Sequence, residues 1–301
     1  MPERRKIGVA LGGGGARGFA HLGILIALEE RGIPVDAIAG TSMGAAVGAA
    51  KALGMDLPRL ARLLECLDLN SLLQVSGSTM REVQRAIGRG MVEYMRGTDW
   101  RDAPTAPEKL ARMFELFSLL TAKKSFSDTA IPLAVVTADL ESGEEVVLRE
   151  GKLYQAVTAS AAVPGVFYPV RHHGRFLIDG GVVNKVPADV AMDLGAEAVI
   201  AVDTGAPLTR RVETSLDALF QAQKISSKTL TDLQLERARA RLGGRLLLLH
   251  PQVEWIGMLG FEHLAEAVQA GKEEANAHME EILLLSESGA SSPSSSARSR
   301  G

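Results

Sequence analysis

The chain has 301 residues and a formal net charge of −3, a length that suffices for one large α/β domain with a sizeable core. The slight acidic balance weighs against nucleic-acid binding, which needs a basic face. An aromatic content of 4% also weighs against recognition of bases by stacking. Cys66 is the single cysteine, which excludes an internal disulfide and a multi-cysteine metal site.

The two ends of the chain differ in composition. The apolar run in "MPERRKIGVALGGGG" is too short for a signal peptide or a membrane span, and we therefore expect a cytoplasmic chain. The last segment, "SESGASSPSSSARSRG", is rich in serine and almost free of apolar residues. This composition predicts one domain over residues 1–285, followed by a disordered tail over residues 286–301.

Predicted strands and helices alternate along most of the chain. A buried strand at residues 6–11 leads through a glycine-rich turn into a helix that ends near residue 32. The further predicted strands are 35–40, 131–140, 144–150, 174–181, 197–203 and 245–251. The further predicted helices are 43–54, several within 56–124, 152–163, 187–195, 211–241 and 261–283. This alternation predicts a largely parallel sheet that is covered on both faces by helices.

The glycine-rich turn is suited to binding an anion. Its sequence "LGGGGARGFAHLG" places Gly13, Gly15 and Gly18 between a strand and a helix, where backbone N–H groups can approach a ligand closely. Dinucleotide binding would need an acidic residue at the end of the second strand, but Asp36 opens that strand instead. The turn is not a P-loop, because it lacks the G-K-[ST] sequence that a P-loop requires. Arg17 could bind a substrate phosphate or anchor the turn to a carboxylate, and we favour anchoring.

A serine stands between the second strand and the next helix. In "IAGTSMGAAVGAA", residues 38–50, Gly40 and Gly44 flank Ser42 in the pattern G-x-S-x-G. The motif is weak alone, but the strand-to-helix position is that of a nucleophile elbow. The amide of Met43 could then help to stabilise negative charge. The alternative is a serine that caps the helix.

The sequence leaves two candidates for the base that would activate this serine. His250 ends a predicted strand after both Ser42 and Asp179, which is the residue order of α/β-hydrolases. Asp179 ends an apolar strand and precedes two glycines. A carboxyl with a pKa of about 3.9 is a poor base, so a Ser–Asp pair would rely on its oxyanion hole. His21, on a helix face, is interpreted as structural.

Three ordered motifs resemble those of one family. "GGGGARG" after the first strand, "GTSMG" after the second and "DGG" at residues 179–181 are similar to the patatin-like phospholipases, in particular to their bacterial branch related to the catalytic domain of neuropathy target esterase. Connecting segments such as "AVTASAAVPGVFYPV" and "GGVVNKVPADVAMDLGA" extend the resemblance over residues 6 to about 280. It is loosest over residues 70–125 and 206–245.

The resemblance implies a three-layer α/β/α sandwich with a mainly parallel central sheet and a patatin-like acyl hydrolase domain over residues 1–285. It implies hydrolysis of lipid acyl esters without a metal or a cofactor, with Ser42 as nucleophile and Asp179 as base. No histidine would then be catalytic. The oxyanion hole would be formed by the amides of Gly13, Gly14 and Gly15. The residues that would support these motifs are Arg17, Gly18, Gly40, Gly44, Gly180 and Gly181.

One predicted helix has a strongly apolar face, and a lipid hydrolase must reach a lipid surface. The face lies in "PEKLARMFELFSLLTAKK" and consists of Leu110, Met113, Phe114, Phe117 and Leu120. It could contact an anionic membrane, although packing on the core is the preferred interpretation. A partner-binding module that retains the fold without catalysis is the remaining alternative to an enzyme.

Overall fold

The computed structural model describes residues 4–73, 108–164, 166–205, 208, 212–213 and 215–287. Its centre is an eight-stranded sheet in which β1, β2, β3, β7 and β8 run parallel. β4 and β6 pair with β3 in antiparallel fashion, and β5 pairs with β6. The strands are β1 (Ile7–Leu11), β2 (Ala37–Thr41), β3 (Leu133–Asp139), β4 (Glu145–Leu148), β5 (Val170–His172), β6 (Arg175–Asp179), β7 (Ala198–Val202) and β8 (Leu246–Leu249).

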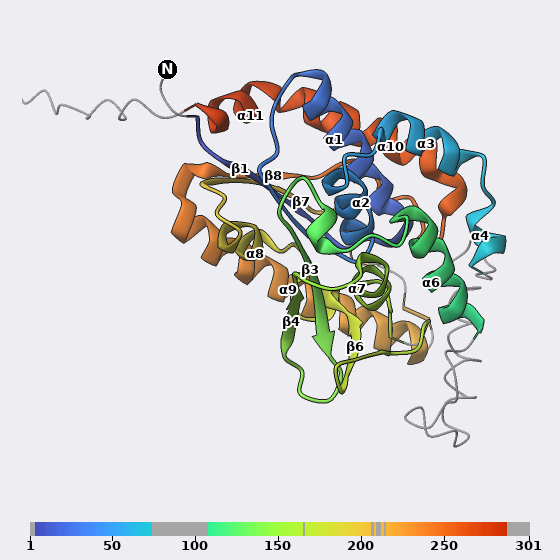
Figure 1. Ribbon diagram of the computed structural model, residues 1–301. Helices are drawn as coiled ribbons and strands as arrows, with labels where there is room; N and C mark the ends of the chain where they lie inside the picture. The colour runs from blue at the N-terminus through green and yellow to red at the C-terminus, as the bar shows by residue number, and fades with distance from the viewer. Residues whose placement is uncertain are drawn as a thin grey trace, which may run out of the picture.

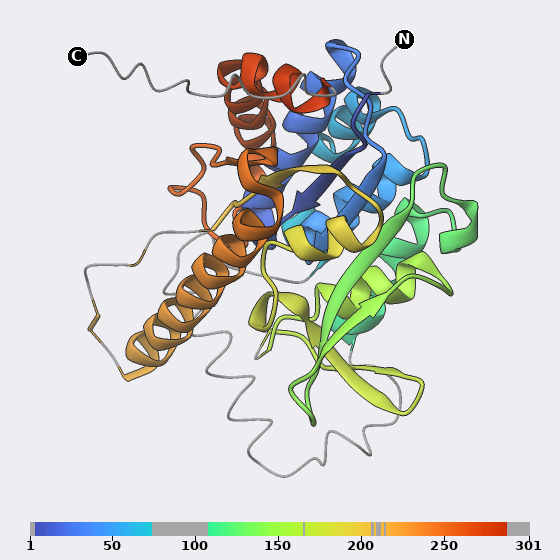
Figure 2. The same ribbon diagram turned by 90° about the vertical axis from the view of Figure 1, so that its left-hand side faces the viewer.

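Helices cover both faces of the sheet, so the predicted three-layer α/β/α architecture is confirmed (Figure 1). α1, α2 and α10 lie on one face, and α8 and α9 lie on the other. The helices are α1 (Ala20–Glu30), α2 (Met43–Ala52), α3 (Leu57–Glu65), α4 (Leu69–Leu72), α6 (Glu108–Leu120), α7 (Leu153–Ser160), α8 (Ala188–Asp193), α9 (Ser215–Leu242), α10 (Leu264–Ala277) and α11 (Met279–Ser286). Figure 2 shows the first turns of α9 extending beyond the sheet.

Alternate residues of the central strands form two different cores. Ile7, Val9 and Leu11 of β1 belong to the large cluster beneath α1 and α10. Ala10 of β1 and Ala39 of β2 belong to the smaller cluster beneath α8 and α9. Side chains alternate between the two faces of a strand. Since each face meets one of the two cores, apolar residues occupy both faces and the strand sequences are nearly continuous apolar runs. Both faces are buried, as expected of a parallel sheet between helices.

Two predicted helices are interrupted in the structure. The helix expected after the glycine-rich turn begins with a 3₁₀ segment, η1 (Gly15–Phe19), before α1 starts. The helix expected over residues 261–283 is split at His278 into α10 and α11. The helices expected within residues 74–107 lie outside the described residues, as does the Ser-rich tail apart from Ser286 and Glu287.

The apolar face of α6 packs inside the protein, as the preferred interpretation of the sequence expected. Leu110, Met113 and Phe117 are each less than a tenth exposed. The ring of Phe114 makes an edge contact with Tyr154, with 6.1 Å between the ring centroids. α6 therefore uses this face against α7 and the core. None of the helices within the described residues combines the length and apolarity needed to cross a membrane.

Candidate active site

Ser42 occupies a strained turn between β2 and α2. Its φ of 56° and ψ of −124° lie outside the regions that L residues favour. Its side chain makes no capping hydrogen bond to α2, which argues against the alternative role of a helix cap. A Cβ on Gly44 would collide with the carbonyl oxygen of Leu11, and one on Gly40 would collide with the backbone of Ala45. The two flanking glycines therefore allow α2 to approach β1 and the end of β2.

The register of β3 brings Ser42 and Asp179 together. β4 pairs with residues 135–138 of β3, whereas β2 pairs with residues 133–136 and β6 with residues 137–139. Residues 135–136 of β3 pair with both β2 and β4, and residues 137–138 pair with both β6 and β4. Since a residue pairs with one strand on each side, β2 and β6 lie on the same edge of β3, opposite β4. Thr41 pairs with Val136 and Asp179 pairs with Thr137, so β2 and β6 meet end to end. The residue after β2, Ser42, therefore faces the last residue of β6.

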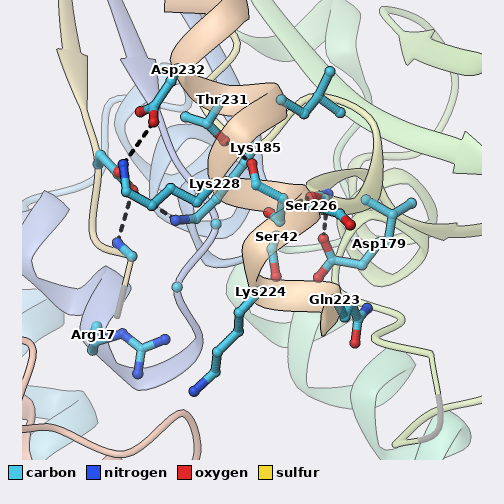
Figure 3. Close-up of a pocket in the computed structure, with 18 of the residues that line it drawn as sticks. Arg17, Ser42, Asp179, Lys185, Gln223, Lys224, Ser226, Lys228, Thr231 and Asp232 are labelled. Carbon is cyan, nitrogen blue, oxygen red and sulfur yellow. Dashed lines mark hydrogen bonds and ion pairs between the residues drawn. The ribbon is translucent and has the colours of Figure 1, made fainter. Parts of the chain in front are cut away.

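Asp179 is a buried carboxylate beside the serine hydroxyl. Burial raises its pKa from 3.8 to about 6, while hydrogen bonds from the Ser42 hydroxyl and the Gly181 amide partly offset this rise. The Gly181 N–H donates to Asp179 Oδ1 at 2.7 Å. A Cβ on Gly180 would collide with the carbonyl oxygen of Val136, so the glycine permits close approach to β3. Figure 3 shows the Ser42 hydroxyl and the Asp179 carboxylate pointing toward each other.

Ser160 is a site residue that the sequence analysis missed. Its hydroxyl accepts the Ser42 N–H at 2.8 Å and donates to the carbonyl oxygen of Val136 at 2.6 Å. It is completely buried at the end of α7. The signal was available in "AVTASAAVPG", a segment that carried the family resemblance without a role assigned to its serine.

The glycine loop offers fewer free amides than its sequence predicted. The Gly13 N–H donates to the carbonyl oxygen of Lys185 at 3.0 Å, so it is not free for an oxyanion in this structure. Within the described residues, the amides of Gly14 and Gly15 have no acceptor. Gly15 has a φ of +60°, and a Cβ there would collide with the carbonyl oxygen of Met258. Of the three amides predicted to form an oxyanion hole, that of Gly13 is therefore engaged by the backbone in this structure.

Arg17 anchors the loop, as we expected, but to carbonyl groups rather than to a carboxylate. Its Nε donates to the carbonyl oxygen of Thr204 at 2.9 Å, and its Nη1 donates to that of Ile256 at 3.0 Å. The side chain is mostly buried, which lowers the pKa of the guanidinium. A Cβ on Gly18 would crowd Met43, so this glycine lets η1 pack against the start of α2.

The two histidines considered in the sequence lie elsewhere. His21 Nε2 lies 2.7 Å from the carbonyl oxygen of Gly12, and burial lowers the pKa of the ring to about 4; His21 is therefore neutral and structural. His250 follows β8, and β1 and β7 lie between β8 and β2 in the sheet. The usual spacing of neighbouring strands puts β8 about 14 Å from β2. Among the described residues, no histidine hydrogen-bonds to Ser42 or Asp179.

A cavity of about 840 Å³ joins these groups. Ser42, Asp179 and the glycine loop line one part of it, and α9 lines another. An ion pair between Lys185 and Asp203, with 2.9 Å between Nζ and Oδ1, lies in the same wall. Within the part of the chain that is described, no three His, Cys, Asp or Glu side chains are grouped closely enough to hold a metal ion.

Comparison with known proteins gives one matching family model and several relatives. Residues 9–192 match the model described as patatin-like phospholipase. An uncharacterised NTE family protein of Mycobacterium tuberculosis is 29% identical over 92% of this chain and 47% of its own length. Human patatin-like phospholipase domain-containing protein 6 is 30% identical over 71% of this chain and 14% of its own length. The chain thus spans less than half the length of these two relatives.

Solved structures with a similar arrangement are more distant in sequence. VipD from Legionella pneumophila superposes with a TM-score of 0.46 at 16% identity, covering 94% of this chain and 67% of VipD. ExoU, from the type III secretion system of Pseudomonas aeruginosa and solved with SpcU, superposes with a TM-score of 0.44 at 17% identity. That alignment covers 93% of this chain and 53% of ExoU.

Proposed function

Because the chain belongs to the patatin-like phospholipase family, we propose that it is a serine acyl hydrolase that cleaves fatty acyl esters of phospholipids or lysophospholipids. Membership of the family implies a lipid-ester hydrolase. The observation that supports the proposal most directly is the placement of the Ser42 hydroxyl, held at a strained elbow, facing the buried carboxylate of Asp179 (Figure 3). Both groups line a cavity large enough for part of a lipid. The proposed catalytic domain extends over residues 1–285.

Acylation begins when Ser42 Oγ bonds to the ester carbonyl carbon and Asp179 accepts the hydroxyl proton. The displaced electron pair moves onto the carbonyl oxygen, where the amides of Gly14 and Gly15 stabilise the negative charge. Such donors are each worth roughly 3–4 kcal/mol in related chemistry. Collapse of the tetrahedral intermediate breaks the bond to the alcohol, which leaves with the proton from Asp179. A fatty acyl group remains on Ser42.

Deacylation uses the same groups in reverse. Asp179 takes a proton from water, whose oxygen attacks the acyl carbonyl carbon. The second tetrahedral intermediate releases the fatty acid and returns the proton to Ser42. A carboxyl with a pKa of about 6 is suited to both roles, because it is ionised at neutral pH yet binds a proton more readily than an exposed aspartate does.

The substitutions Ser42→Ala and Asp179→Asn test this proposal. Each variant should lose hydrolysis of p-nitrophenyl esters and lysophospholipids while its circular dichroism spectrum stays that of the wild type. A fluorophosphonate probe should label Ser42, as located by mass spectrometry of the digested protein. Full activity in Ser42→Ala would count against Ser42 as the nucleophile. An absence of any ester hydrolysis by the wild type would count against an enzyme and favour a non-catalytic module.

A triad that includes His250 is the second candidate, because His250 lines the same cavity as Ser42. It lies in electrostatic range of Asp203, whose pKa is lowered, against the effect of burial, chiefly by Lys185 and to a smaller extent by His250. The Ser–Asp proposal predicts that His250→Ala keeps most of the ester hydrolysis, whereas a triad predicts a loss comparable to that of Ser42→Ala. The two outcomes separate the candidates in a single assay.

A further inference from the structure

We propose that Lys224 of α9 binds the phosphate of the lipid head group while the acyl ester of the same molecule lies at Ser42. This inference rests on the proposed function and adds to it a residue that selects among acyl esters. It assigns the enzyme to glycerolipids that carry a phosphodiester, in preference to uncharged acylglycerols. The segment that contains Lys224 lies where the family resemblance is loosest, so the role comes from this chain's own geometry.

Lys224 lines the same cavity as Ser42 and Asp179. In Figure 3 the Lys224 side chain extends from α9 away from Ser42, toward the side on which Arg17 lies. Asp179 lies on the other side of Ser42 in this view. The catalytic carboxylate and the lysine amine therefore occupy different ends of the space around the nucleophile.

Lys224 differs from the two other lysines of the cavity wall, since within the described residues it has no ion-pair partner. Lys185 is paired with Asp203, and Lys228 is paired with Asp232 at 2.7 Å between Nζ and Oδ2. Among the described residues, no carboxylate pairs with Lys224, which is half-buried. Burial and the nearby charge of Arg17 lower its pKa.

An unpaired, partly desolvated ammonium group is unfavourable, and a bound anion would offset this cost. The positive charge of Arg17 adds to the attraction for such an anion, while its Nε and Nη1 remain engaged with the backbone. A phosphodiester has a single negative charge and several acceptor oxygens, which suits the compact donor group of lysine. In a glycerolipid this phosphate is only a glycerol's length from the acyl ester.

Two substrates with the same acyl chain isolate the contribution of the phosphate. Lysophosphatidylglycerol carries the phosphodiester, and the corresponding monoacylglycerol lacks it. We expect Lys224→Met to lower kcat/KM for lysophosphatidylglycerol by about tenfold or more, as the loss of one charge-assisted contact predicts. Hydrolysis of the monoacylglycerol should change less than about twofold. Lys224→Arg, which keeps the charge, should retain most of the activity on lysophosphatidylglycerol.

Lys228→Met is the matched control, since Lys228 lies one turn further along α9 and lines the same cavity. Its charge is already paired with Asp232, so the preference for lysophosphatidylglycerol should stay near that of the wild type. The rate of fluorophosphonate labelling, which needs no head group, should be unchanged in both methionine variants.

Three results would overturn the inference. They are an equal loss of activity on both substrates in Lys224→Met, no change on either, and an equal change of preference in Lys228→Met. In each case Ser42→Ala would still lose all hydrolysis if the proposed function is correct, so the enzyme would stand without this head-group contact. If the wild type hydrolyses neither ester, or if Ser42→Ala retains the activity, the proposed function fails and this inference fails with it.

Discussion

The hydroxyl of Ser160 connects the backbone of Ser42 to strand β3. It accepts the Ser42 N–H at 2.8 Å and donates to the carbonyl oxygen of Val136 at 2.6 Å. Ser42 holds a φ of 56°, and such conformations persist only where the surroundings fix them. Since Val136 pairs with the residue before Ser42, the bond fixes the nucleophile against the strand that also holds Asp179.

Removal of this hydroxyl should lower the rate of catalysis more than substrate binding. We predict that Ser160→Ala lowers kcat for p-nitrophenyl esters by roughly 10- to 100-fold with little change in KM, because a small displacement of the nucleophile is costly. It should lower the free energy of unfolding by roughly 1–3 kcal/mol, since the buried Val136 carbonyl loses its donor.

Thr158→Val is the matched control for Ser160→Ala. Thr158 is also buried in α7, but its hydroxyl donates to the carbonyl oxygen of Tyr154 at 2.7 Å. The control should lose some stability in urea unfolding and keep its kcat. Equal losses of kcat in the two variants would assign Ser160 a structural role only.

The backbone strain at Ser42 should appear as a difference in the free energy of unfolding between two variants of this residue. Ser42→Gly removes the Cβ that makes a φ of 56° and a ψ of −124° unfavourable, whereas Ser42→Ala keeps it. We expect the glycine variant to be more stable than the alanine variant by about 1 kcal/mol, after the larger chain entropy of unfolded glycine is subtracted. Urea unfolding at one pH gives the difference directly, and both variants should be inactive.

Ala46→Gly serves as the reference for that comparison. Ala46 lies in the helical conformation of α2, where glycine is less favourable than alanine by about 1 kcal/mol. The same pair of residue types should thus have opposite effects at positions 42 and 46. A less stable glycine variant at position 42 would show that the turn stores no strain there.

The pKa of Asp179 predicts the acid side of the pH profile. Asp179 must be ionised to accept the proton from Ser42, and its pKa is raised to about 6. kcat/KM should therefore rise with pH up to about 6 and level off above it, since this quantity reports the free enzyme. The second-order rate of fluorophosphonate labelling should follow the same curve. A flat profile between about pH 5 and 8 would indicate an aspartate with an ordinary pKa.

The sequence was sufficient for the groups that local motifs specify. The order of strands and helices predicted the parallel sheet, because periodic apolar patterns follow from burial on one or two faces. The turn containing Ser42 was identifiable because the G-x-S-x-G glycines allow a close backbone approach that side chains would block. The sequence placed Asp179 at the end of a strand without showing that its partner would be Ser42. That result depends on β2 and β6 sharing one edge of β3.

The features that the sequence did not reveal depend on contacts between distant segments. The engagement of the Gly13 amide by Lys185 joins residues far apart in the chain. The position of Lys224 beside Arg17 likewise depends on how α9 crosses the sheet. The face of α6 illustrates a further limit, because an apolar stripe at helical spacing is the same whether it meets a membrane or Tyr154.

The same buried carboxylate should lower the stability of the protein at neutral pH. Its pKa is about 6 in the folded protein and 3.8 in the unfolded reference, so the folded state holds more protons between these values. The free energy of unfolding therefore falls as the pH rises through this window, and the loss persists above pH 6.

Asp179→Asn removes this cost while its side-chain oxygen can still accept the Gly181 N–H. We predict that at pH 8 the variant unfolds with a free energy about 2–3 kcal/mol above that of the wild type, and that the difference nearly disappears below about pH 4. Ser42→Ala, which is inactive but keeps the carboxylate, should also lose stability as the pH rises. Its loss should extend to a somewhat higher pH, because the variant lacks the hydroxyl whose hydrogen bond lowers the pKa of Asp179. The acid titration of His21 is common to all three proteins and cancels in the comparison. A variant Asp179→Asn that is less stable than the wild type at pH 8 would contradict the raised pKa on which the catalytic role of Asp179 depends.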